Sequence, residues 1–458
     1  MRRAEMNRAV AQQSSAEHLL TGPILPLLLR FSLPNMVAML ATALAAMAET
    51  VYVGNFGPPA LAGMALVFPF VMLQTMLSGG AMGGGVSSAV SRALGANDPG
   101  RANDLAVHAL WIGIAGGGIF MLMMELLGPS LMAALGGSGE ALLQAVAYGE
   151  VAFLGSIFVW VLNTLSSVLR GSGNMRVPSV TLVVVALAQV FFAGALGLGW
   201  GSLPQLGMRG VAAGGVLANA VGALFLWGYL ASGRGKIKLK IRATQLVRQH
   251  FHAILRVGAV ACFSPFQTVL TVLILTHLVT KFGTQALAGY GIGTRLEFLL
   301  VPIAFAVGVA SVPLVGMAIG AGDSARARKV AWTAAALASL LLGTLGMVVA
   351  VAPQLWTALF TQEPLVMASS AHYFLWAGPF YGFFGLGLSL YFSSLGAGRA
   401  LGPVLAGTFR LLVVAVGGAL LAYWNSPAWM IFALVGVGMA VYGISTALFI
   451  QYTPWGEK

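Results

Sequence analysis

The chain of 458 residues carries very little charge and almost no cysteine. Only 8% of its residues are Asp, Glu, Lys or Arg, whereas 59% are hydrophobic. A soluble domain cannot hide that much apolar surface, so the composition excludes a water-soluble enzyme or binding module. The single cysteine, Cys262, excludes a disulfide within the chain and argues against a thiolate metal site.

Motifs for catalysis and nucleotide hydrolysis are also missing. The sequence has no GxxxxGK[ST] loop to cradle ATP phosphates, no HExxH pair, and no Ser, His and Asp set at catalytic spacing. His250 and His252 flank Phe251 in a basic stretch, and we interpret them as solvated loop residues rather than metal ligands. We therefore expect no enzyme and no cofactor. Any transport would draw on an ion gradient, run passively or use a partner.

Basic residues give the chain a net charge of +12, but they lie at helix ends and in short loops. We therefore expect no nucleic-acid partner. The run between residues 236 and 242 alternates Lys and apolar residues, which suits a spacer that marks the cytoplasmic side. Contact of its basic side chains with anionic lipid headgroups is the alternative. Membrane lipid is thus an expected partner.

Apolar runs long enough to cross a membrane recur along the chain, since about 20 apolar residues span the hydrocarbon core. The twelve runs lie near residues 31–53, 60–83, 106–127, 148–169, 178–199, 208–230, 253–280, 287–317, 330–351, 372–395, 402–423 and 428–450. Lys and Arg gather in the loops on one side, whereas the opposite loops carry only Arg209 and Lys281. By the positive-inside rule both termini are cytoplasmic, and we expect an integral protein of a bacterial inner membrane.

The two halves of the sequence repeat each other. Residues of the first half recur 225 or 226 positions later, with Phe56, Gly57, Leu61, Gly95, Asp98, Arg101, Tyr148, Gly171, Gly173 and Pro178 matched by Phe282, Gly283, Leu287, Gly320, Asp323, Arg326, Tyr373, Gly396, Gly398 and Pro403. Six spans per repeat is an even number, so both halves enter the membrane in the same direction. The expected fold is an all-α membrane protein with twelve transmembrane helices in two six-helix lobes, related by a pseudo-two-fold axis along the membrane normal.

This organisation divides the chain into five parts. They are a cytoplasmic leader at 1–23, an N-lobe with helices 1–6 at 24–231, a basic cytoplasmic linker at 232–250, a C-lobe with helices 7–12 at 251–451, and a cytoplasmic tail at 452–458. In each repeat an aspartate, Asp98 or Asp323, directly precedes a helix and is expected to cap it.

One carboxyl group, that of Glu49, lies in the outer part of the first span. A charge inside the bilayer costs at least ~2.5–3.5 kcal/mol, so the residue needs a reason to be there. We interpret Glu49 as the ion-coupling residue, because such a carboxyl can hold a proton or, when ionised, a cation. A carboxyl that reaches out to water is the alternative. Polar partners must come from other helices, and the candidates are Gln74, Asn163, Thr164, Gln189 and Asn219.

Four further titratable residues fall within spans of the second half. Arg295 and Glu297 stand at i and i+2 in the eighth span, on nearly opposite faces, so they cannot pair well with each other. Arg410 lies in the eleventh span and His277 near the outer end of the seventh. All four are candidates for substrate or ion coupling. The alternatives are a structural contact of Glu297 with Arg410 or Arg295, and a polar helix-end role for His277.

Several segments around these residues resemble the MATE (multidrug and toxic compound extrusion) family. They are ETVYVGNFGPPALAGMALVFP, SRALGANDPGRA and LRGSGNMRVP in the first half, and KFGTQALAGYGIGTRLEFLLVP, LVGMAIGAGDSARARK and SSLGAGRALGPV in the second. The resemblance implies two six-helix lobes around a V-shaped cavity. It also implies export of organic cations or amphiphilic drugs in exchange for H⁺ or Na⁺.

The resemblance carries over only in part. Family members commonly have Asp where Glu49 stands, and DinF-like members have Asn and Asp in the fifth helix where this chain has Leu187 and Phe191. NorM-like members use acidic residues in the seventh and tenth helices, where this chain offers His277 but no carboxylate. A proton needs one carboxyl, whereas Na⁺ needs several oxygen ligands. We therefore expect an H⁺ gradient rather than a Na⁺ gradient to drive transport.

The leading hypothesis is a secondary active multidrug exporter that works as a monomer. It would antiport small organic, cationic and amphiphilic compounds against H⁺ by alternating access of its two lobes. The alternatives are Na⁺-coupled export, a flippase for a lipid-linked or polysaccharide precursor, and a channel or receptor that transports nothing. Arg295 and Arg410 would favour anionic substrates if they line the cavity.

Overall fold

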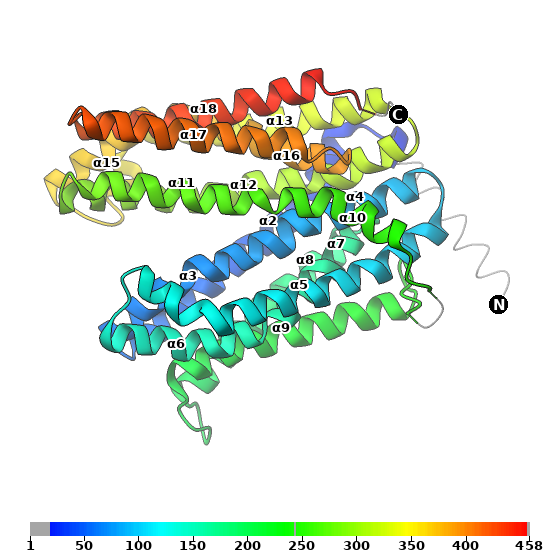
Figure 1. Ribbon diagram of the computed structural model, residues 1–458, viewed down its shortest axis with the longest axis horizontal. Coiled ribbons are helices and arrows are strands. Elements are labelled where there is room, and N and C mark those ends of the chain that lie inside the picture. Colours follow the sequence, from blue (N-terminus) through cyan, green and yellow to red (C-terminus); the bar gives the residue numbers. More distant parts are fainter. Residues whose placement is uncertain (1–18, 242–243, 456–458) are drawn as a thin grey trace. The chain divides into compact units, whose positions relative to one another are not determined.

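The computed structural model describes residues 19–241 and 244–455, and every regular element in those ranges is a helix (Figure 1). The all-α membrane fold expected from the sequence is confirmed. The chain separates into two compact units: unit 1 runs from Leu33 to Ala259, and unit 2 comprises residues 19–32 and the chain from Val260 onward. The domain boundaries inferred from the sequence stay predictions, and most of the leader and the end of the tail lie outside the described residues.

Unit 1 holds the helices of the first repeat and most of α10, where the seventh span begins, drawn from blue to green in Figure 1. The pair α8 and α9 packs along its full length, α5 packs against α6 and α7, and α3 packs against α6. The elements are α2 (Ile24–Gly54, which enters unit 1 at Leu33), α3 (Pro58–Thr75), η1 (Met76–Met82), α4 (Gly83–Gly95), α5 (Pro99–Ala134), α6 (Gly139–Leu154), α7 (Ser156–Gly171), α8 (Arg176–Leu198), α9 (Gly207–Ala231) and α10 (Arg248–Ala261).

Unit 2 holds the helices of the second repeat, drawn from green to red. Here α13 packs on α16, α17 on α18, and α12 on α16 and α13. The elements are α11 (Phe263–Thr280), α12 (Thr284–Gly320), α13 (Ser324–Val351), α14 (Gln354–Thr357), α15 (Pro364–Ala377), η2 (Gly378–Phe380), α16 (Tyr381–Gly396), α17 (Leu401–Tyr423) and α18 (Ala428–Tyr452).

Ten apolar helical stretches in the described residues are long enough to cross a membrane, and α6 with α7, bent by 48°, gives an eleventh. The remaining segment, from α15 to α16, is interrupted by the short 3₁₀ turn η2 and completes the twelve spans expected from the sequence. The protein is therefore an integral membrane protein. The two interruptions also fall at equivalent places, because Gly155 between α6 and α7 corresponds to Phe380, 225 residues later.

The internal repeat is visible in local geometry. Gly57 and Gly283 begin equivalent helices with φ of 92° and 89°, a region that favours glycine. The side chain of Asp98 accepts a hydrogen bond from the backbone N–H of Arg101 at 2.9 Å, and Asp323 accepts one from Arg326 at 2.8 Å. Both aspartates therefore cap helices, as predicted.

The expectation for the central histidines was wrong in one respect. Since α10 begins at Arg248, both His250 and His252 are helical rather than in a loop. His252 is exposed, but the ring of His250 is partly buried and lies with its centroid 4.9 Å from that of His108. The helix α10 begins within the basic stretch, at Arg248, and includes both histidines.

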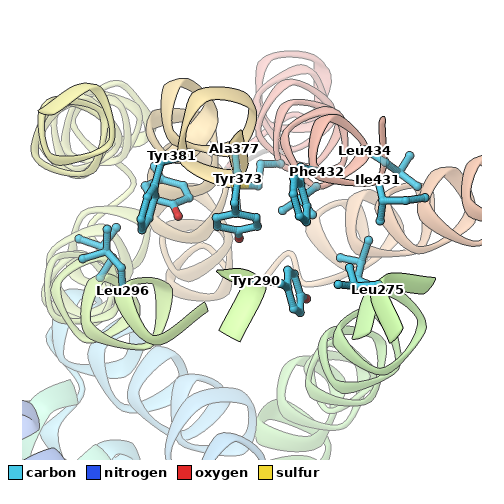
Figure 2. Close-up of a cluster of buried hydrophobic side chains, with 14 of the residues drawn as sticks. Leu275, Tyr290, Leu296, Tyr373, Ala377, Tyr381, Ile431, Phe432 and Leu434 are labelled. Atoms are coloured by element: carbon cyan, nitrogen blue, oxygen red, sulfur yellow. The ribbon is translucent and has the colours of Figure 1, made fainter. Parts of the chain in front are cut away.

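The core of unit 2 is lined with aromatic rings. Figure 2 shows Tyr373 between Tyr381 and Phe432, with Tyr290 facing it. The ring of Tyr373 makes edge contacts with those of Tyr290 and Phe432, both with centroids 5.5 Å away. A buried tyrosine needs a hydrogen-bond partner for its hydroxyl, so polar groups are expected beside this cluster.

Candidate functional site

Glu49 on α2 lies inside unit 1 and is only 3% exposed. The side-chain amide of Gln189 on α8 donates a hydrogen bond from Nε2 to Oε1 of Glu49 at 2.9 Å. Tyr148 on α6 lies close enough for the charge of Glu49 to act on its hydroxyl. Among the described residues the one salt bridge joins Arg209 to Glu150, so no cation pairs with Glu49 there. A buried carboxylate without such a partner is costly, and a bound proton would remove its charge.

Close packing of α8 on α9 brings these groups together. A Cβ atom on Gly214 would lie 2.3 Å from the backbone N of Ala193, and one on Gly210 would lie 2.3 Å from the carbonyl O of Leu196. Only glycine permits this approach, as is common between helices in lipid. One residue on, a Cβ on Gly215 would lie 3.6 Å from Oε1 of Glu49. The small residues of α9 therefore make the wall of the site.

The fifth span contributes Gln189, one of the polar partners expected for Glu49. Leu187 and Phe191 are 66% and 59% exposed, on the face of α8 that points away from Glu49. Gln189 occupies the inward face and holds the carboxyl. Asn219 on α9 donates from Nδ2 to the carbonyl O of Gly215 at 2.8 Å, one turn earlier, and so serves the backbone next to the site.

Three other candidates contact groups other than Glu49: Gln74 and Asn163 lie at the π-helical segment η1, and Thr164 lies against α5. Nε2 of Gln74 donates to the carbonyl O of Ser156 at 3.4 Å, and Nδ2 of Asn163 donates to Oγ of Ser78 at 2.8 Å. Thr164 is fully buried against Gly113, and its hydroxyl has no hydrogen-bond partner among the described residues. The bond of Asn163 joins α7 to η1, and the bond of Gln74 joins α3 to α7. Turns of π-helix are frequent at functional sites.

A second carboxyl, Glu297 on α12, lies inside unit 2. The hydroxyl of Tyr373 on α15 donates a short hydrogen bond to Oε1 of Glu297. Tyr381 and Tyr290 lie close enough to Glu297 for its charge to act on their hydroxyls. The hydroxyl of Tyr381 has no hydrogen bond of ordinary geometry within the described residues. Glu297 therefore sits among tyrosine hydroxyls rather than against a cation.

Arg410 on α17 is partly buried near Glu297, and the charges of the two groups act on each other. They form no salt bridge. Instead the guanidinium lies over two aromatic rings. Its Cζ is 5.6 Å from the ring centroid of Phe384 and 5.9 Å from the ring centroid of Tyr442. Its Nε has no hydrogen-bond partner in the part of the chain that the structure describes. The arginine is thus held by aromatic faces.

The remaining candidates do not join this group. Arg295 is exposed, and its Cζ lies 5.2 Å from the ring centroid of Phe360, on another side of α12 from Glu297. His277 is exposed in the last turn of α11. No set of three or more His, Cys, Asp or Glu side chains in the described residues is close enough together to hold a metal ion.

The tyrosines were not recognised as site residues from the sequence, although the repeat held the signal. Tyr148 and Tyr373 are equivalent residues, 225 positions apart. In the structure each lies beside a carboxyl group of its own unit, Tyr148 near Glu49 and Tyr373 bonded to Glu297. The two carboxyl groups are not equivalent, since one comes from the first span of its repeat and the other from the second.

Comparison with known proteins identifies the family. The MatE family model matches residues 34–193 and 261–424, one stretch in each repeat. The probable multidrug resistance protein NorM of Thermotoga maritima is 26% identical over 379 residues, which is 82% of this chain and 81% of that protein. The FAD transporter of Shewanella oneidensis is 24% identical over 363 residues, covering 78% of this chain and 79% of that protein.

The fold has counterparts among solved structures. A MOP superfamily transporter from Pyrococcus furiosus, described as having a binding pocket of reverse polarity, superposes with a TM-score of 0.87 at 22% identity, covering 95% of this chain and 96% of that one. A MATE structure in complex with MaD3S gives a TM-score of 0.85 at 23% identity, over 95% and 97% of the two chains. These likenesses concern the fold. Because the family model matches well over half of the sequence, this chain belongs to the MatE family.

Proposed function

We propose that this protein is a secondary active multidrug exporter, which antiports small organic, cationic and amphiphilic compounds against H⁺ by alternating access of its two lobes. The observation that carries the proposal is the environment of Glu49, a carboxyl that is 3% exposed and bonded to the neutral amide of Gln189. A group of this kind gains or loses a proton in place of another cation. It requires neither a bound cofactor nor ATP.

The same environment supports H⁺ over Na⁺ as the coupling ion. Sodium is a hard cation that needs several oxygen ligands at once. Gln189 instead presents its amide nitrogen to Glu49, and the carbonyl O of Gly215 already accepts from Asn219. A proton needs only the carboxyl oxygen that Gln189 leaves free.

The substrate class rests on charge and on the relatives. The carboxyl of Glu49 can hold a proton or the positive charge of a substrate, but not both, which gives exchange its physical basis. The relative from Thermotoga maritima is named a probable multidrug resistance protein, which supports a broad range of organic compounds. The proposed exporter is a single chain in the inner membrane of a bacterium, with both termini in the cytoplasm.

The experiment is efflux of ethidium, a fluorescent organic cation, from membrane vesicles that contain the protein. An imposed pH gradient and an imposed Na⁺ gradient are compared for the wild type, Glu49→Gln and Glu150→Gln. The last variant is the matched control, because Glu150 lies in the same unit but is exposed and paired with Arg209. We expect the pH gradient to drive efflux in the wild type and the control, and Glu49→Gln to abolish it at equal expression. Efflux driven by Na⁺ alone would contradict proton coupling.

A second candidate function is export of organic anions, and Arg410 favours it. This partly buried arginine has no salt bridge within the described residues, so its charge is available to an anionic ligand. A relative from Shewanella oneidensis is named an FAD transporter, and FAD carries a negatively charged pyrophosphate. Under this alternative, uptake of FAD into inverted vesicles would depend on Arg410, and Arg410→Gln would abolish it. If Arg410→Gln still exports ethidium, the result would favour organic cations over organic anions as the substrate class.

A further inference from the structure

Three side chains of α5 fasten the linker between the two repeats to unit 1. Oδ1 of Asn103 accepts a hydrogen bond from the backbone N–H of Lys238 at 2.7 Å. Oδ1 of Asp104 accepts one from the hydroxyl of Thr244 at 3.2 Å. Nε2 of His108 accepts one from the backbone N–H of Val247 at 2.8 Å, just before α10 begins at Arg248. The bond from Val247 to His108 holds the residue that precedes α10, and of the three bonds it alone has an imidazole as its acceptor.

The contacts of His108 define which nitrogen carries its proton. Nδ1 lies 2.7 Å from the backbone carbonyl O of Asp104, and a carbonyl can only accept, so Nδ1 must carry the hydrogen. Nε2 then has a lone pair, and this lone pair accepts from the N–H of Val247. His108 is 0% exposed, and both ring nitrogens are used. The arrangement requires the neutral imidazole.

Proton uptake by His108 would therefore break the bond to Val247. The imidazolium carries a hydrogen on each nitrogen, so Nε2–H would face the N–H of Val247 with no acceptor between them. The ring of His250 lies with its centroid 4.9 Å away in an edge contact, and that of Phe251 lies 4.7 Å away. A charged ring would thus also lie against an apolar face and a second imidazole. All of these groups belong to unit 1.

The surrounding charges do not remove this conflict. Arg101 opposes a second positive charge, while Asp104 and Asp98 favour one, and all three act on the neighbouring His250. The titratable and charged groups of this region include Arg92, Asp98, Arg101, Asp104, His250 and Arg256, and the linker adds Lys238 and Arg248. A carboxylate can stabilise an imidazolium, but it cannot restore the acceptor that Val247 has lost.

We propose that His108 is a proton-operated latch between α5 and the linker. In its neutral form it holds residues 244–247 and the start of α10 against unit 1, and on protonation it releases them. Histidine is the side chain that ordinarily changes charge between about pH 5 and 8, which sets the pH range over which the latch is tested. The proposal goes beyond export and does not depend on it, because it concerns the linker whatever the chain transports.

The test is hydrogen exchange of the full-length protein in lipid nanodiscs, read by mass spectrometry on peptides that cover residues 236–252. Exchange is expressed as protection relative to an unfolded chain at the same pH, since the intrinsic rate itself varies with pH. We expect protection of residues 244–250 to fall about tenfold or more between about pH 7.5 and pH 5.5, while α8 keeps its protection. Constant protection of the linker across this range would overturn the proposal.

Two variants assign the change to one ring. In His108→Gln the fall with pH should disappear, because no group at that place can take up a proton. In His250→Gln, the matched control on the neighbouring ring, the fall should remain. A fall that persists in His108→Gln, or that is lost in His250→Gln, would overturn the assignment to His108. If His108→Gln does not fold, His108→Asn takes its place, because asparagine also takes up no proton in this range.

Discussion

Replacing Gly214 by alanine is expected to spread α8 and α9 and to disturb the site around Glu49. The new Cβ would lie 2.3 Å from the backbone N of Ala193, 2.5 Å from its Cα and 2.6 Å from the carbonyl C of Phe192. Non-bonded carbon atoms rest about 3.5–4.0 Å apart, so the two helices must separate by about 1 Å. All three contacts are backbone atoms, which cannot turn aside as a flexible side chain would.

The magnitude follows from two opposing effects. Overpacking of a tight interface costs about 1–3 kcal/mol. Alanine returns about 0.5–1 kcal/mol, because glycine weakens a helix interior. We therefore expect Gly214→Ala to lower the free energy of unfolding by up to about 2.5 kcal/mol. Ala193 lies one turn from Gln189, so the same shift also displaces the amide that holds Glu49. Transport should fall by up to about a hundredfold, as expected for a displacement of about 1 Å at a site.

The assays are thermal unfolding of the purified protein and ethidium efflux from vesicles. Gly228→Ala is the matched control, because Gly228 is in the same helix and no atom lies within 4 Å of its Cβ position. The control should unfold at the same or a higher temperature and transport normally. Equal stability and equal transport for Gly214→Ala would refute the view that the approach of α8 to α9 builds the site.

Other predictions concern single hydrogen bonds. Gln189→Leu removes the amide that holds Glu49 and should reduce pH-driven ethidium efflux by about tenfold, since a hydrogen bond to a charged group contributes about 1.5–3 kcal/mol; normal efflux would contradict a role for this bond. Tyr373→Phe leaves a buried carboxyl without its donor and should lower the unfolding temperature, whereas Tyr452→Phe, at a position 81% exposed, should not. Asp98→Ala removes a helix cap and should cost about 0.5–2 kcal/mol of stability, which Asp98→Asn should largely restore.

The architecture was predictable because it follows from composition and repetition. A helix must satisfy its backbone groups internally in lipid, so each apolar run of sufficient length becomes a span. The repeat then located features that recur in the structure, including the turn glycines Gly57 and Gly283 and the caps Asp98 and Asp323. The sequence did not reveal that the span from α15 to α16 is interrupted at η2, since Gly378 and Pro379 also occur in unbroken membrane helices.

The site was predictable only in part, because a membrane helix is apolar on all sides and its sequence does not reveal which face points inward. Glu49 and Gln189 were both candidates, but their contact depends on how closely α8 approaches α9. Leu187 and Phe191, which the alignment matches to the Asn and Asp of DinF-like members, are both exposed, and Gln189 supplies the polar contact of α8 with Glu49. One residue along a helix turns a side chain by about 100°, so the face that a residue presents depends on its exact position in the span.

The contacts that were missed link residues far apart in the chain. The hydroxyl of Tyr373 bonds to Glu297, 76 residues earlier, and Tyr373 had served only as a marker of the repeat. The backbone N–H of Val247 bonds to His108, 139 residues earlier. Neither pair has a local pattern in the sequence. Both were found because buried polar atoms need partners, and those partners became visible only in the folded chain.

Proton release on substrate binding tests the central claim most directly. Purified protein in weakly buffered detergent solution is mixed with ethidium, and the released protons are counted with a pH indicator while binding is followed by fluorescence. The account predicts that the wild type and Glu150→Gln release protons as they bind ethidium, whereas Glu49→Gln releases none. Ethidium binding to the wild type without proton release, or equal release from Glu49→Gln, would contradict the exchange of a proton for an organic cation at Glu49.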